Sequence, residues 1–193
     1  MKNKNTPIPS PEENMKSHFD VGIYGWWGHD NYGGCLTYFA LERVIKKLGY
    51  SVLMIQEPFG YHGRYKIPDT SIAMRHAIKY YHRTPQLDKS ELGKLNQICD
   101  RFVVGGDQMW NYCIHFVKND CFLDFVADDK LKLSYSTSFG HAGHNPPSDV
   151  QYERTQLLKR FDAISVREEY AVDIARSKYG AKATSVVDAV FSS

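Results

Sequence analysis

The sequence contains no apolar stretch close to the ~18 residues that a membrane span requires, and residues 1–20 lack the apolar centre of an export signal. We therefore expect no transmembrane segment and a cytoplasmic location. An excess of one charge is also missing, because 24 basic residues are balanced by 22 acidic ones interspersed along the chain. This balance argues against nucleic acid as a partner and is compatible with a small charged ligand.

Cysteine is scarce, with four residues in the chain, and the absence of an export signal predicts that they are reduced thiols. A zinc site could be imagined from Cys113, His115 and Cys121, with Cys99 upstream. These residues lack the two-to-four-residue ligand spacing of a zinc finger or knuckle. We therefore predict no disulfide framework, no metal site and no cofactor.

The length of 193 residues, with 42% hydrophobic and 24% charged residues, predicts one folded domain. Residues 1–18 are polar and carry three prolines, which is typical of a flexible leader. We therefore predict a leader over residues 1–18 and a domain over residues 19–193.

Short apolar runs alternate with helix-length amphipathic segments along that domain. Strands are predicted at 21–25, 52–55, 102–104, 131–136, 163–166 and 184–187. Helices are predicted at 36–48, 71–81, 90–98, 148–160 and 168–178. This alternation predicts an α/β fold with a Rossmann-like, doubly wound parallel sheet.

Ligands of open parallel sheets bind beyond the carboxyl ends of the strands, so the segments that follow strands are the candidate sites. The first segment, residues 25–34, joins a strand to a helix, and its backbone N–H groups could hold a phosphate or carboxylate. It contains Asn31 and Gly33, but its glycines do not match the spacing of the dinucleotide fingerprint. The alternative is that the glycines serve only the turn.

The second segment, residues 105–111, puts Asp107, Gln108, Trp110 and Asn111 on one turn after a buried strand. An indole ring next to amides and a carboxylate suits a sugar, whose C–H face stacks on the ring while its hydroxyls are hydrogen-bonded. The alternative is that Trp110 packs in the core and Asp107 caps the following helix.

The third segment, residues 136–141, offers the hydroxyls of Ser136 and Ser138. The fourth, residues 165–169, opens a helix with Arg167, which can bind a carboxylate or phosphate or can pair with Glu168.

Taken together, these segments resemble the amino-terminal half of a polysaccharide pyruvyl transferase. The matching stretches are N-Y-G-G-C-L-T-Y-F-A-L, D-R-F-V-V-G-G-D-Q-M-W-N, L-S-Y-S-T-S-F-G, F-D-A-I-S-V-R-E and a closing V-V-D. They cover roughly residues 20 to 190, and the D-Q-x-W-N motif is the most specific of them.

The resemblance implies an enzyme with two Rossmann-like halves, similar to GT-B glycosyltransferases. Such an enzyme moves a pyruvyl group from phosphoenolpyruvate to a pair of sugar hydroxyls as a ketal, in capsule or exopolysaccharide synthesis. The acceptor would be a sugar or a lipid-linked saccharide. The matching positions predicted to line the cleft are Asn31, Asp107, Gln108, Trp110, Asn111, Ser138 and Arg167. Asp107 is the expected base or hydroxyl anchor.

Two positions depart from the family pattern. Gly106 replaces the usual serine before Asp-Gln, and Ala189 replaces the proline after Asp188. In the family a second domain follows that aspartate, and we expect it to be absent here. The chain would then be incomplete alone and would need a partner domain or a homodimer. The alternatives are a non-catalytic sugar-binding or pairing module and a nucleotide-sugar-binding, glycosyltransferase-like domain.

Overall fold

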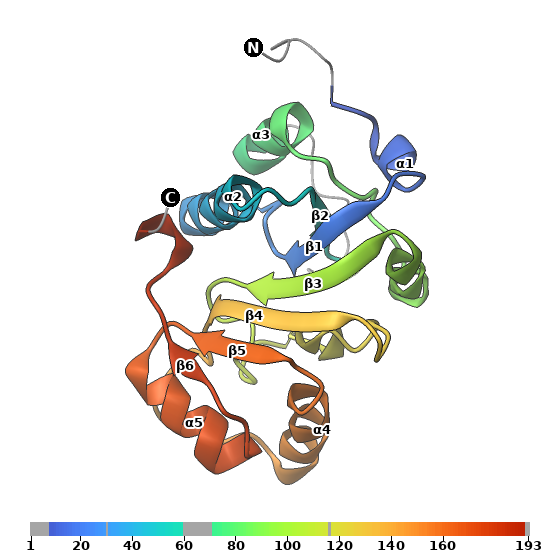
Figure 1. The fold of residues 1–193 in the computed structure, drawn as a ribbon. Coiled ribbons are helices and arrows are strands. Elements are labelled where there is room, and N and C mark those ends of the chain that lie inside the picture. Colours follow the sequence, from blue (N-terminus) through green and yellow to red (C-terminus); the bar gives the residue numbers. More distant parts are fainter. Residues whose placement is uncertain (1–7, 30, 60–70, 116, 192–193) are drawn as a thin grey trace.

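A computed structural model describes residues 8–29, 31–59, 71–115 and 117–191 (Figure 1). Its sheet has six strands in the order β2-β1-β3-β4-β5-β6, and every pairing is parallel. The strands are β1 (Phe19–Gly25), β2 (Val52–Gln56), β3 (Cys99–Gly105), β4 (Leu131–Thr137), β5 (Ala163–Val166) and β6 (Thr184–Ser185). The predicted Rossmann-like α/β fold is therefore confirmed.

Helices cover both faces of the sheet (Figure 1). They are α2 (Tyr32–Lys47), α3 (Ile72–Tyr80), α4 (Ser148–Leu158) and α5 (Glu169–Tyr179). Successive strand residues point to opposite faces, which divides the core into two clusters. One cluster joins the sheet to α2 and α3 through Ile23, Met54, Val103, Leu41 and Ala77. The other lies on the opposite face and includes Tyr24, Ile55, Val104, Phe122 and Ala175.

The strand order reverses between β1 and β3, because the chain first adds β2 on one side of β1 and then returns to the other side. In doubly wound sheets a crevice opens at the carboxyl ends of the strands where this reversal occurs. A short 3₁₀ helix, η3 (Ala189–Phe191), follows β6 and packs against α2 beside this edge (Figure 1). Among the described residues, no helix has the length and apolar character of a bilayer span.

Two predicted elements need correction, and one short helix was not predicted. The predicted helix over 90–98 is a 3₁₀ helix, η1 (Lys89–Gln97), and it contains Gly93, which weakens an α-helix. The last strand is shorter than predicted, since β6 ends at Ser185. A further short 3₁₀ helix, η2 (Asn119–Phe122), lies within the long connection between β3 and β4.

The described part of the predicted leader is also structured. Helix α1 (Pro11–Asn14) is capped by Ser10, whose Oγ accepts a hydrogen bond of 3.2 Å from the Glu13 N–H. The buried Asn14 amide donates to the Arg83 carbonyl at 3.0 Å, which ties this turn to the domain. Residues 1–7 lie outside the described part of the chain.

Candidate functional site

A pocket of about 580 Å³ opens at the reversal point, beyond the carboxyl ends of β1, β3, β5 and β6. Its polar lining comes from four separate loops. The histidine, charged, amide and glycine residues at its wall are His29, Asn31, Gly33, Gly34, Asp107, Gln108, Arg167 and Asp188. The strand-end rule therefore brings five predicted site residues into one cavity, namely Asn31, Gly33, Asp107, Gln108 and Arg167.

Tyr38 of α2 joins the ends of β1 and β3 at the base of this pocket. Its hydroxyl donates to the Gly105 carbonyl at 2.6 Å and accepts a hydrogen bond from the Trp26 N–H at 3.1 Å. Burial raises the pKa of Tyr38, so the phenol remains protonated and keeps donating. The residue fixes the geometry of the two loops that follow β1 and β3.

The position of Tyr38 also explains why residue 106 is a glycine. A Cβ atom at Gly106 would lie 2.8 Å from the Tyr38 Oη, and the φ angle of Gly106 is +107°, which side-chain-bearing residues rarely adopt. A Cβ at Gly25 would likewise collide with the Tyr38 ring. A side chain at position 106 would therefore meet the Tyr38 hydroxyl and need a backbone conformation that favours glycine.

Asn31 begins α2 as its N-cap. Its Oδ1 accepts a hydrogen bond of 3.2 Å from the Gly34 N–H, which satisfies one of the unpaired donors of the first turn. A side chain at Gly33 would place Cβ 3.3 Å from that Oδ1. Gly33 and Gly34, in the amino-terminal turn of α2, line the pocket near the positive end of the helix dipole.

Arg167 is the central charge of the pocket. Its Nη2 lies 2.6 Å from Asp107 Oδ1 and 2.9 Å from Glu168 Oε1, and its Nη1 lies 3.7 Å from Asp188 Oδ2. Partial burial acts to lower the pKa of Arg167, but the hydrogen bonds and charges of Asp107 and Glu168 outweigh it and raise the pKa. One guanidinium thus ties together the chain segments that follow β3, β5 and β6.

A sequence model of the polysaccharide pyruvyl transferase family matches residues 31–193. The chain belongs to the polysaccharide pyruvyl transferase family. A search of curated proteins found no significant match to it. The match begins at the N-cap of α2 and includes the loops after β3, β5 and β6, so it contains most of the pocket wall. Membership supports a pyruvyl-transferase-like function with a sugar acceptor.

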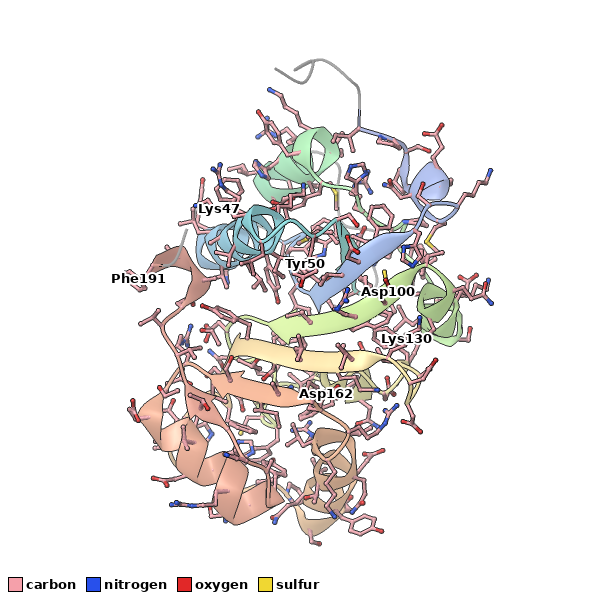
Figure 2. All side chains as sticks on the ribbon, in the orientation of Figure 1. Lys47, Tyr50, Asp100, Lys130, Asp162 and Phe191 are labelled. Atoms are coloured by element: carbon pink, nitrogen blue, oxygen red, sulfur yellow. The ribbon has the colours of Figure 1, made fainter. Side chains whose placement is uncertain are left out.

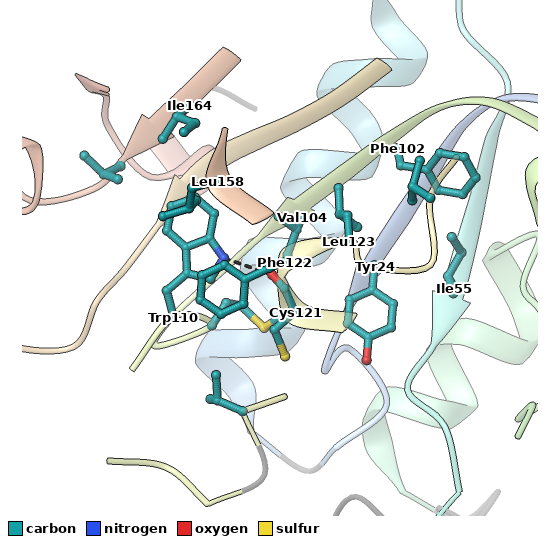
Figure 3. Close-up of a cluster of buried hydrophobic side chains, with 14 of the residues drawn as sticks. Tyr24, Ile55, Phe102, Val104, Trp110, Cys121, Phe122, Leu123, Leu158 and Ile164 are labelled. Atoms are coloured by element: carbon teal, nitrogen blue, oxygen red, sulfur yellow. Dashed lines mark hydrogen bonds between the residues drawn. The ribbon is translucent and has the colours of Figure 1, made fainter. Parts of the chain in front are cut away.

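The D-Q-x-W-N motif of this pyruvyl transferase family member corrects the expectation for Trp110. The Trp110 ring is fully buried, stacks on Phe122 at a centroid distance of 5.4 Å, and donates its indole N–H to the Cys121 carbonyl at 2.9 Å (Figure 3). A ring without exposed surface cannot receive a sugar. The expected stacking role is therefore wrong, and the alternative of a core residue is correct.

Three other predicted site residues are also buried away from the pocket lining. The Asn111 side chain donates to Gln108 Oε1 at 2.9 Å and accepts from the Cys113 N–H at 3.0 Å. Ser138 accepts a hydrogen bond of 3.0 Å from the Gly140 N–H. Ser136 adopts a left-handed φ of +53° within β4, and its hydroxyl lies in the interior. These three side chains support the loops from the interior of the protein. Because they do not line the pocket, the prediction that they contact substrate is wrong.

Of the described histidine and cysteine side chains of the pyruvyl transferase domain, only that of His29 lines the pocket, and Cys35 lies near it. His144 is buried and its Nε2 lies 2.6 Å from the Tyr179 hydroxyl, whereas His141 is exposed outside the pocket. None of the four cysteines, all of which lie in the described ranges, forms a disulfide bond. Within the described ranges, no group of three His, Cys, Asp or Glu side chains is arranged to hold a metal ion.

Sequence reasoning did not single out His29 and Glu57. His29 lines the pocket, and its Nε2 is hydrogen-bonded to Oε1 of the buried Glu57. Glu57 directly follows β2, so the strand-end rule alone could have found it. His29 lies inside the glycine-rich segment, residues 25–34, for which only the backbone N–H groups, Asn31 and Gly33 were predicted to bind a ligand.

Proposed function

We propose that this protein transfers the pyruvyl group of phosphoenolpyruvate to two hydroxyls of a sugar or lipid-linked saccharide, forming a ketal in capsule or exopolysaccharide synthesis. We assign the acceptor side of this reaction to the pocket. The observation that supports the assignment is the Arg167 cluster, in which a guanidinium holds the Asp107 and Asp188 carboxylates at the wall. The proposal places the reaction in the cytoplasm, where reducing conditions suit four cysteines that form no disulfide bond.

The charge balance of the cluster favours a ligand rich in hydroxyls. Carboxylates accept hydrogen bonds from sugar hydroxyls, and the Gln108 amide can both donate and accept. The positive charge of Arg167 is already countered by neighbouring carboxylates. An anion placed on Arg167 would meet Asp107 and Asp188 at close range and be repelled by them.

The phosphoenolpyruvate anion therefore needs a different part of the pocket. We assign it to the amino-terminal turn of α2, at Gly33, where the positive end of the helix dipole favours negative charge. This places donor and acceptor in one cavity, with Asp107 as the anchor for an acceptor hydroxyl. In this arrangement Arg167 orients Asp107, and the amino-terminal turn of α2 binds phosphoenolpyruvate.

The open side of the pocket supports a second wall. Leu36, Val190 and Phe191 are apolar and 55%, 39% and 82% exposed beside the cavity, and Phe191 projects from the segment that follows β6 (Figure 2). Apolar side chains grouped at a binding site are commonly covered by another protein surface. We propose a second domain of a GT-B-like arrangement, a partner domain or a second copy as that surface.

The test is ketal formation by the purified protein. The protein is incubated with phosphoenolpyruvate and a panel of nitrophenyl hexosides, and mass spectrometry and released phosphate report the product. We expect a ketal with at least one acceptor, and we expect Asp107→Asn and Arg167→Lys to reduce its formation. The matched control is the exposed Arg176–Asp173 pair on α5, whose Arg176→Lys and Asp173→Asn variants should retain full activity.

Two results would contradict the proposal. Saccharide binding without any binding of phosphoenolpyruvate would identify a sugar-binding or pairing module. Saturable binding of a UDP- or GDP-sugar in its place would identify a glycosyltransferase-like domain. Calorimetric titration with each ligand separates these cases.

A further inference from the structure

We propose that His29 is the proton-transfer residue of this pocket and that the buried Glu57 positions it. This inference rests on the proposed function and adds to it a group that carries protons. The two residues come from different loops, and His29 lies two residues before the segment that the family model matches, whereas Glu57 lies inside it.

The topology of the sheet brings these two residues together. β1 and β2 are neighbours in parallel register, with Gly25 opposite Gln56, so their carboxyl ends lie side by side. His29 follows β1 in the glycine-rich loop, and Glu57 is the first residue after β2. The His29 Nε2 is hydrogen-bonded to Glu57 Oε1. His29 and Glu57 can therefore pair because the carboxyl ends of β1 and β2 are adjacent.

The burial of the two partners differs in a way that suits their proposed roles. The Glu57 side chain is 2% exposed, whereas the His29 side chain is 27% exposed and lines the pocket. The second carboxylate oxygen of Glu57 is buried and has no hydrogen-bond partner among the described residues. Such a carboxylate is costly to bury for stability alone, so its placement against an imidazole points to a functional constraint.

The hydrogen bond selects the form of the imidazole. A carboxylate accepts a hydrogen bond, so the neutral His29 ring carries its proton on Nε2 and leaves Nδ1 as the basic nitrogen. The same bond fixes the orientation of the ring and stabilises the imidazolium after proton uptake, as a carboxylate does in catalytic triads. Glu57 thereby acts through His29 and does not itself meet the substrate.

The other ionisable groups of the described pocket wall are less suited to proton transfer. Asp107 and Asp188 are engaged by Arg167, and a proton on either would break an ion pair. Tyr38 is a buried phenol that donates to a carbonyl. Close to His29, the Cys35 thiol is directed to the His29 backbone carbonyl at 3.5 Å. His29 combines access to the pocket with an imidazole ring, which has both a donor and an acceptor nitrogen in its neutral form.

The proposed step balances as follows. An acceptor hydroxyl oxygen bonds to C2 of phosphoenolpyruvate, its proton passes to His29 Nδ1, and C3 takes a proton from water to become a methyl group. The C2–O bond to phosphate then breaks with its electron pair on the oxygen. The second hydroxyl oxygen bonds to C2 and releases its proton to water, while His29 returns its proton to the departing phosphate.

The kinetic test compares His29→Gln with Glu57→Ala and Glu57→Gln in the purified protein. We expect His29→Gln to lower kcat about 100-fold or more with little change in KM, which is the usual contribution of a general acid–base. Glu57→Ala should lower kcat about 10-fold or more, as loss of an orienting partner does. Glu57→Gln retains a hydrogen-bond acceptor and should recover part of that loss.

The matched control is a second histidine–carboxylate pair, His18 with Asp100, whose Nε2 and Oδ1 lie 3.0 Å apart. It lies at the amino ends of β1 and β3. Figure 2 shows Asp100 at the end of the strands that is opposite to Phe191. His18→Gln and Asp100→Asn should leave kcat unchanged. Equal losses in both pairs would indicate a general effect on folding.

A spectroscopic measurement tests the positioning separately. Long-range ¹⁵N–¹H spectra report which imidazole nitrogen carries the proton, and wild-type His29 should be in the Nε2–H form. Glu57→Ala should produce a mixture of tautomers, whereas Glu57→Gln should preserve the wild-type form. An unchanged His29 tautomer in Glu57→Ala would overturn the positioning role.

The outcomes also separate this inference from the proposed function. A wild-type protein that forms the ketal and a His29→Gln variant that is equally active would overturn only the assignment to His29. A wild-type protein that binds neither phosphoenolpyruvate nor any acceptor saccharide would overturn the proposed function and the proton-transfer step with it. His29 is partly exposed, so its substitution leaves the core intact and keeps the test decisive.

Discussion

Replacement of Trp110 by alanine is expected to destabilise the protein and to affect binding only through that loss. The Trp110 side chain is completely buried, contacts the rings of Phe122, Phe139 and Phe161, and donates a hydrogen bond to Cys121. Truncation of a buried aromatic ring costs about 3–5 kcal/mol. Since a domain of this size loses about 2–4 °C in Tm per kcal/mol, the midpoint should fall by roughly 6–20 °C.

Urea and thermal unfolding of wild type, Trp110→Ala and Trp110→Phe measure this effect. Trp110→Phe retains most of the apolar contact but leaves the buried Cys121 carbonyl without its donor, so a smaller loss of about 1–3 kcal/mol is expected. Saccharide binding is measured well below the unfolding midpoint, where both variants should bind like wild type. Wild-type stability of Trp110→Ala combined with lost saccharide binding would refute the core assignment.

Two further perturbations test the loop geometry and a buried histidine. Gly25→Ala forces a methyl group into the Tyr38 ring and should lower the free energy of unfolding by roughly 1–3 kcal/mol. Gly93→Ala, with no neighbour within 4 Å of the added Cβ, should stay close to wild type in the same urea titration. Burial lowers the pKa of His144 from 6.5 to about 4, so between these values the unfolded state binds a proton that the folded state does not. Stability should therefore fall as the pH drops through this window, and His144→Gln should show a shallower fall; equal slopes would contradict the assignment.

Much of the fold could be predicted from local patterns because both faces of the sheet are covered. The runs at 21–25, 52–55 and 163–166 match β1, β2 and β5 to within two residues at each end. Apolar continuity is what burial on two faces requires, so it is visible in the sequence. The docking of α1 was not predictable in this way, because it depends on a contact between Asn14 and the distant Arg83 carbonyl.

The candidate site was predictable to the level of loops but not of side chains. The rule for strand ends correctly grouped Asn31, Asp107 and Arg167 around one pocket. It could not determine which side of each loop faces the ligand. That choice depends on backbone angles such as the φ of +55° at Gln108, which redirects the chain between Asp107 and the buried Met109.

The D-Q-x-W-N motif combines two roles in one turn, because part of it lines the pocket and part of it packs in the core. Its first half presents Asp107 and Gln108 to the pocket, and its second half holds Trp110 and Asn111 in the interior. The buried half sets the position of the exposed half. The backbone N–H of Trp110 donates to the Ser138 carbonyl at 3.0 Å, and the side-chain amide of Asn111 donates to Gln108 Oε1. A tryptophan, which suits sugar binding, can therefore be present in such a motif because it packs in the core. Exposure at the pocket wall, which only the three-dimensional structure provides, decides between the two roles.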